Sequence, residues 1–212
     1  MVATYPDRLT AVCSFDAMAD DAVDVLKDLI SRGCSGIRFF TTGTTMPGQS
    51  TWLNSPKTYP VWEYASRTRL SICVQANPAG MGMLTEMMDR FPAVPIILDH
   101  CGRANLDDGP PYGDSQVIFA MGSRYPQLTV KFSPAVIERA SKGKATPETF
   151  VPMLVDAFGT NRIVWGSNFP ASHGTLGEIA EACAAAFAFL PAGDVDKIMG
   201  TNALRLYSAL NR

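Results

Sequence analysis

The chain has two histidines, and one of them, His100, lies where chemistry is expected. His100 ends the apolar run that begins at Pro95, and Cys101, Gly102 and Arg103 follow it. An imidazole titrates close to neutral pH, so His100 can accept a proton or polarise a carbonyl group. Arg103 carries a planar guanidinium that suits a substrate carboxylate, although a surface ion pair would also explain it. This turn predicts acid–base chemistry beside an anion-binding group.

Other polar residues stand inside or directly after apolar runs, and we take them as site candidates. They are Arg38, Gln75, Lys131, Ser133 and Asn168. Arg38 lies within an apolar strand, so it either reaches into a substrate site or pairs with a buried acid. Asn168 is either a site residue or a turn residue before Phe169 and Pro170. Its amide can orient water but cannot accept a proton from it.

Several reactive side chains have a structural interpretation instead. Asp99 and Cys101 are neighbours of His100, and adjacent strand residues point to opposite faces, so Asp99 is expected to be structural and Cys101 not nucleophilic. His173 is expected in a solvated loop. The cysteines are odd in number, with no C-x-x-C pair, so we expect all of them to be reduced and no structural zinc site. The five cysteines are Cys13, Cys34, Cys73, Cys101 and Cys183.

Short apolar runs rich in β-formers alternate along the chain with longer stretches of helical periodicity. Strands are predicted at Leu9 to Phe15, Gly36 to Phe40, Leu70 to Gln75, Val94 to Asp99, Leu128 to Phe132 and Arg162 to Trp165. Helices are predicted at Asp20 to Ser31, Pro60 to Thr68, Met81 to Phe91, Asp114 to Tyr125, Pro147 to Phe158 and Thr175 to Leu190. This alternation indicates an α/β fold with a parallel sheet.

An open doubly wound sheet and a (β/α)8 barrel both fit this alternation. The glycine patterns that cradle a dinucleotide or a nucleotide phosphate in open sheets are not found in the sequence. Polar residues instead follow many of the strands, as on the carboxyl face of a barrel. We therefore predict a (β/α)8 TIM-barrel type, with residues 1–212 as one domain.

Composition excludes several classes of partner. Lys and Arg total 18 against 20 Asp and Glu, so the chain has no general attraction for nucleic acid or anionic membranes. The sequence has neither a signal-peptide pattern nor an apolar run of the roughly 18 residues that a membrane span needs. We expect a cytoplasmic protein that acts on small molecules.

Four segments together resemble the amidohydrolase-related TIM-barrel hydrolases, in the branch that includes 2-pyrone-4,6-dicarboxylate lactonase and L-fuconolactonase. The segments are Gly36 to Phe39, Asp99 to Arg103, Arg162 to Pro170 and Thr201 to Tyr207. The resemblance implies a hydrolase that opens a lactone or cyclic ester of a small carboxylic acid. In it Arg38 and Arg103 would hold the anionic group, with Gln75, Lys131 and Ser133 as further substrate-binding residues. His100 would polarise the carbonyl, and Asn168 would position water.

The sequence departs from the family pattern in two places. The family's first strand carries a His-x-His pair, which this sequence lacks, so the barrel is expected without that strand. The family has an acid where this chain has Asn168. We therefore expect no metal or other cofactor held by this chain alone; zinc would need ligands from outside it. Unpaired strand edges beside the gap predict a homo-oligomer, or a strand supplied by a region outside this sequence.

Two other functions stay open at this point. The loss of the acid and of the first strand would also suit a barrel that binds small carboxylates without catalysis. A metal-dependent decarboxylase of the same superfamily is the third interpretation.

Overall fold

The computed structural model of the 212-residue chain describes residues 2–45 and 51–207. Its strands are β1 (Ala11–Cys13), β2 (Cys34–Phe40), β3 (Ser71–Gln75), β4 (Ile96–Leu98), β5 (Leu128–Phe132) and β6 (Ile163–Trp165). They form one six-stranded sheet in the order β1-β2-β3-β4-β5-β6, and the registers of the first three strands and of β5 with β6 are parallel. The sheet is not closed, because β1 and β6 are its edges among the described strands. The predicted strands and the parallel α/β fold are confirmed.

The helices agree with the predicted stretches in most places. They are α1 (Ala22–Ser31), α2 (Tyr59–Thr68), α3 (Met81–Arg90), α4 (Gln116–Arg124), α5 (Pro134–Arg139), α6 (Pro147–Phe158), α7 (Leu176–Ala185), α8 (Ala192–Asp196) and α9 (Asn202–Leu206). The sequence did not predict α5, α8 and α9, since five or six residues are too few to show helical periodicity. None of the helices in the described segments is long and apolar enough to cross a membrane.

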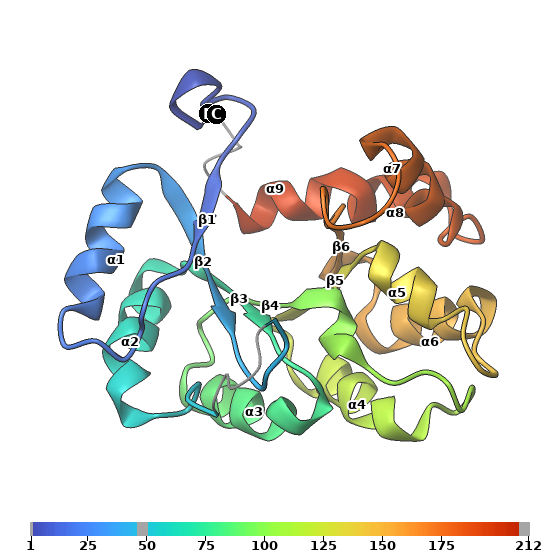
Figure 1. Ribbon diagram of the computed structural model, residues 1–212, viewed down its shortest axis with the longest axis horizontal. Coiled ribbons are helices and arrows are strands. Elements are labelled where there is room, and N and C mark those ends of the chain that lie inside the picture. Colours follow the sequence, from blue (N-terminus) through green and yellow to red (C-terminus); the bar gives the residue numbers. More distant parts are fainter. Residues whose placement is uncertain (1, 46–50, 208–212) are drawn as a thin grey trace. The chain divides into compact units, whose positions relative to one another are not determined.

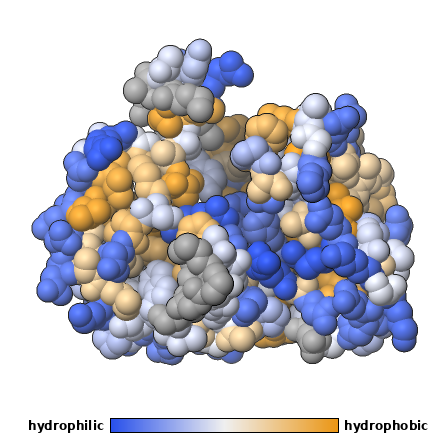
Figure 2. Space-filling view, viewed as in Figure 1, coloured by the Kyte–Doolittle hydropathy of each residue, from blue (hydrophilic) through white to orange (hydrophobic). Residues whose placement is uncertain are grey.

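The chain divides into two compact units. The first contains residues Met1–Ile97 and Leu204–Arg212. Here β2 and β3 pair in register, with Arg38 beside Cys73 and Phe40 beside Gln75. Helices α1 and α2 pack together (Figure 1). Trp62 of α2 is fully buried in the core. Apolar and polar side chains intermingle on the surface over α1 (Figure 2). Val25 of this helix is exposed.

The second unit contains residues Leu98–Ala203. Helices α4 and α6 pack closely because Gly122 has no side chain: a Cβ there would lie 2.6 Å from the Phe158 ring. Arg162, just before β6, donates from Nη1 to the carbonyl oxygens of Gly122, Tyr125 and Leu128 at 2.7, 3.0 and 3.4 Å. One guanidinium thus ties the end of α4 to the start of β5.

The prediction that all cysteines are reduced is wrong for one pair. Cys13 of β1 and Cys34 of β2 form a disulfide with their Cα atoms 6.4 Å apart, whereas Cys73, Cys101 and Cys183 are free and buried. The sequence argument used local spacing, and these two residues are 21 positions apart. Pairing of the two strands in the sheet brings them together.

Candidate functional site

Strand β4 leads directly into a left-handed turn, the short helical segment Asp99–Arg103. The φ values of His100, Cys101 and Gly102 are 51°, 50° and 63°, and that of Arg103 is 48°. This conformation costs about 1–2 kcal/mol for each residue that has a Cβ, so surrounding contacts must hold the turn. The turn fixes His100 directly after the carboxyl end of the strand.

The His100 ring is 7% exposed, and its Nδ1 lies 2.7 Å from Oγ of Ser133. Ser133 follows β5 and is fully buried, and its hydroxyl bonds to no other group among the described residues. If the hydroxyl accepted a proton from Nδ1, its own hydrogen would be left without an acceptor. We therefore assign the hydroxyl as the donor to Nδ1, which places the ring proton on Nε2. A neutral imidazole in this tautomer can donate a hydrogen bond to a carbonyl oxygen.

Asp99 forms an ion pair with Lys131, which lies on β5. Its fully buried carboxylate lies 2.5 Å from Nζ of Lys131, whose side chain is 21% exposed. Lys131 and Ser133 are two positions apart, so they project from one face of β5. Asp99 and His100 therefore both contact that face. The sequence predicted that these two side chains would point to opposite faces of a strand, but the backbone of His100 is left-handed rather than extended, so that alternation does not hold. The structural role expected of Asp99 agrees with this ion pair.

Arg139, near the end of α5, is a site residue that the sequence did not indicate. Its Nη2 donates to the carbonyl oxygen of His100 at 2.6 Å, and its buried Nε has no partner among the described residues. Burial lowers the pKa of Arg139, and the positive charge of Arg103 lowers it further. Two guanidinium groups near one turn, one of them with an unsatisfied donor, favour binding of an anion. Ser133-Pro134, which starts α5, was the signal that could have revealed this helix.

The end of β6 contributes a close approach to Lys131. A Cβ on Gly166 would lie 2.7 Å from Lys131 Cδ, so the glycine leaves room for the lysine stem. Two residues later, Asn168 has a φ of 53°, and its Nδ2 donates to Ser172 Oγ at 3.1 Å. Asn168 is in the same compact unit as His100, and no measured contact joins the two side chains. His173 is exposed on the following loop, as expected.

Arg38 and Gln75 form a separate cluster in the first unit. Arg38 Nη2 donates to Gln75 Oε1 at 2.8 Å, and its guanidinium carbon lies 4.6 Å from the centre of the Phe40 ring. Gln75 Nε2 in turn donates to the Thr45 hydroxyl at 3.1 Å. These contacts place Arg38 in a polar cluster at the carboxyl ends of β2 and β3. Its role in binding substrate stays a prediction.

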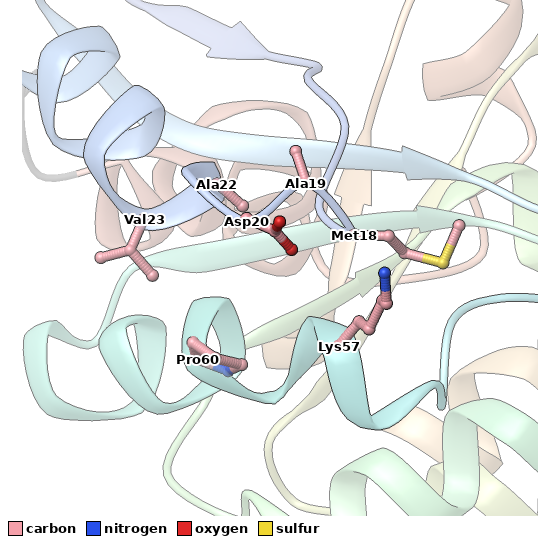
Figure 3. Close-up of a pocket in the computed structure, with 7 residues that line it drawn as sticks. All are labelled: Met18, Ala19, Asp20, Ala22, Val23, Lys57 and Pro60. Atoms are coloured by element: carbon pink, nitrogen blue, oxygen red, sulfur yellow. The ribbon is translucent and has the colours of Figure 1, made fainter.

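Two cavities are lined by none of these residues. One, of about 210 Å³, is lined by Met18, Asp20, Lys57 and Pro60 among others, and Figure 3 shows the Lys57 amine pointing up between Asp20 and Met18. The other, of about 340 Å³, lies between α6 and the segment after α7 that includes Phe189. The first has the carboxylate of Asp20 and the amine of Lys57 in its lining, and the second has Glu148, but neither contains a histidine or a cysteine.

The residues around His100 that the structure describes do not fit a metal ion. In the two described stretches, no group of three or more His, Cys, Asp or Glu side chains is placed to bind one ion. Ser133 also occupies Nδ1 of His100, and the amide of Asn168 is a weaker ligand than a carboxylate. We therefore assign no step of the chemistry to a metal held by these residues.

Cys101 provides a direct test of the turn's burial. Burial raises the pKa of its thiol to about 12, and Arg139 opposes this shift only in part. The thiol should stay protonated and unreactive in the folded protein at pH 9, where an ordinary cysteine is half ionised. We expect iodoacetamide at pH 9 to modify Cys101 only after unfolding, as measured by peptide mass spectrometry. The free thiol form stabilises the fold below pH 9, and this contribution is lost as the pH rises towards 12. Rapid native alkylation of Cys101 would contradict the burial.

Comparison with known proteins identifies the family. The amidohydrolase family model Amidohydro_2 matches residues 1–209, so the chain belongs to the amidohydrolase family. The fold is of the TIM-barrel type: the whole chain superimposes on 70% of a TIM-barrel protein of Bordetella bronchiseptica, with a TM-score of 0.71 and 17% identity. No curated protein matched the sequence.

Three further solved structures show the range of the fold. A probable 2-pyrone-4,6-dicarboxylic acid hydrolase of Acinetobacter baumannii with bound citric acid has a TM-score of 0.74 and 19% identity, over 98% of this chain and 76% of that one. A Burkholderia multivorans amidohydrolase with bound zinc has a TM-score of 0.77 and 16% identity, over 94% and 73%. A dihydroxybenzoic acid decarboxylase of Polaromonas with bound manganese has a TM-score of 0.64 and 16% identity, over 100% and 72%. At these low identities, the TM-scores establish the shared fold alone.

Proposed function

We propose that the protein is a hydrolase that opens a lactone or similar cyclic ester of a small carboxylic acid. The observation that carries the proposal is His100: a buried imidazole, held at Nδ1 by Ser133, beside two guanidinium groups. This arrangement supplies a neutral hydrogen-bond donor for a carbonyl oxygen and positive charge for a carboxylate. The citric acid bound to the Acinetobacter protein supports a carboxylate ligand for this fold.

In the proposed reaction the substrate carboxylate binds to Arg103, and the positive charge of the buried Arg139 guanidinium strengthens this binding. The Nε2–H group of His100 then donates to the lactone carbonyl oxygen and stabilises the negative charge that develops when water adds to the carbon. Asn168 orients the water. The ring opens when the carbon–oxygen bond to the leaving alkoxide or enolate breaks, and this oxygen takes up, through solvent water, the proton that the added water loses. Lys131 and Ser133 act mainly by holding Asp99 and His100. The Arg38–Gln75 cluster is proposed as a second anion-binding group, to be tested separately.

The experiment that tests this function is a hydrolysis assay with paired lactones that differ only in a carboxylate substituent. We expect acid release, followed by pH-stat, with kcat/KM at least tenfold higher for the carboxylated member. The Asn168→Asp variant supplies a base for water and should raise kcat about tenfold near neutral pH. Equal rates for the two lactones would contradict the proposed anion site. No turnover with any lactone by either protein would contradict the proposed function.

Two alternatives give different results in the same assays. A non-catalytic carboxylate-binding barrel would show a rise in melting temperature with small di- and tricarboxylates and no turnover. The second alternative is a metal-dependent decarboxylase, and the likeness to the Polaromonas decarboxylase supports it. Such an enzyme would release CO₂ from an aromatic acid only with manganese or zinc.

A further inference from the structure

We propose that the Cys13–Cys34 disulfide is a reversible redox latch that holds the edge strand β1 on the sheet. The two cysteines lie on neighbouring parallel strands, with their Cα atoms 6.4 Å apart. Cys34 is paired in register with Ala11, so its disulfide runs diagonally to Cys13, two residues further along β1. The covalent bond therefore connects the far end of the edge strand to the start of β2.

The non-covalent attachment of β1 is small. The strand has three residues, and its register with β2 shifts between Ala11 and Val12. Beyond the strand, the Thr10 hydroxyl bonds to Ser35 Oγ at 2.7 Å, and the Ser14 hydroxyl donates to the carbonyl oxygen of Arg38 at 2.9 Å. Val12 is 38% exposed, so its burial adds little. The disulfide is thus the dominant restraint on this strand.

The disulfide is also open to attack. Cys13 is half-buried on the edge strand, so a dithiol reductant can reach its sulfur, whereas Cys34 and the three free cysteines are buried. A reductant thiolate attacks Cys13 Sγ, and the bond to Cys34 breaks with Cys34 leaving as a thiolate that then takes a proton. The second reductant thiol displaces Cys13 and forms the oxidised reductant. Two electrons and two protons pass to the protein, and two free thiols result.

Reduction changes which strand is the edge of the sheet. With β1 released, β2 presents its unpaired backbone groups, next to the buried side chains of Ile37 and Phe39. The same release frees Ser14 from the carbonyl oxygen of Arg38. The redox state therefore controls the exposure of the strand that carries Arg38.

The test begins with thiol counting on air-oxidised protein. Iodoacetamide in guanidinium chloride should alkylate three of the five cysteines before treatment with dithiothreitol and all five afterwards, as measured by intact mass. Alkylation of all five without reductant would overturn the proposal.

Hydrogen exchange then distinguishes a disulfide that holds only β1 from one that stabilises the whole protein. Dithiothreitol should speed amide exchange in β1 and at its β2 partners by about 100-fold while the amides of β5 stay protected. We expect the wild-type melting temperature to fall by about 6–12 °C with dithiothreitol.

The C13A/C34A variant should already exchange fast in β1, and its melting temperature should not change with dithiothreitol. The matched control C183A, which removes a buried free thiol, should keep the shift. Unchanged protection of β1 after reduction, or loss of protection in β5 as well, would overturn the latch.

Discussion

Replacing His100 with alanine is expected to lower kcat for lactone opening by about 10²–10³-fold, because the variant lacks the donor that stabilises the developing oxyanion. The KM for a carboxylated lactone should change little, since Arg103 and Arg139 remain. His100→Gln restores an N–H donor in a side chain of similar reach and should recover part of kcat. Steady-state kinetics on folded, purified variants measures both values.

The matched control for this prediction is His173→Ala, which removes the exposed second histidine and should keep wild-type rates. Ser133→Ala tests the tautomer assignment, because without its hydroxyl the ring proton is no longer directed to Nε2. We expect Ser133→Ala to lower kcat about tenfold, because the variant loses one hydrogen bond to the imidazole. Wild-type activity in His100→Ala would remove His100 from the mechanism.

Replacing Lys131 with methionine is expected to have the largest effect on stability. The substitution keeps the length of the side chain beside Gly166 but removes the ammonium that lies 2.5 Å from the fully buried Asp99 carboxylate. Breaking one side of a buried ion pair costs about 3–5 kcal/mol, and the partial exposure of Lys131 favours the lower value. The free energy of unfolding from urea denaturation measures the loss.

A second substitution isolates the pair from other effects at the same position. Asp99→Asn together with Lys131→Met removes both charges, so the double variant should regain part of the loss, with a coupling energy above about 1 kcal/mol. Lys142→Met serves as a control because Lys142 is exposed, and its change should stay within about 0.5 kcal/mol. Additive effects of the two site substitutions would mean that the ion pair does not stabilise the fold.

The sequence predicted the strands well because their apolar runs are continuous and bounded by turn residues. Leu128 to Phe132 agrees with β5 at both ends, and Pro147 to Phe158 agrees with α6, where Thr146 and proline mark the start. The predicted helix at Thr175 to Leu190 is five residues too long at its end, since the alanine-rich segment after Ala185 has no glycine or proline to mark the boundary.

The candidate site was predicted only as a set of positions. His100 was found because it follows an apolar strand, and Ser133 and Lys131 because they end the next one. Their partners depend on the conformation of the chain after Leu98, where left-handed backbone angles carry His100 to the same face of β5 as Asp99. Periodicity cannot show such a turn, and neither Arg139 nor the pairing of Cys13 with Cys34 has a local sequence signal.

The left-handed turn has a consequence for how the protein can vary. At residues 100, 101 and 103 glycine would fit the backbone better than histidine, cysteine or arginine, and each non-glycine residue forgoes roughly 1 kcal/mol there. A random library selected for thermostability alone should therefore enrich glycine at the exposed residue 103, while selection for turnover should reject it. Buried His100 is not expected to follow, because glycine there would leave a cavity and an unsatisfied Ser133 hydroxyl. The turn is a place where the best-folding sequence and the best-working sequence differ.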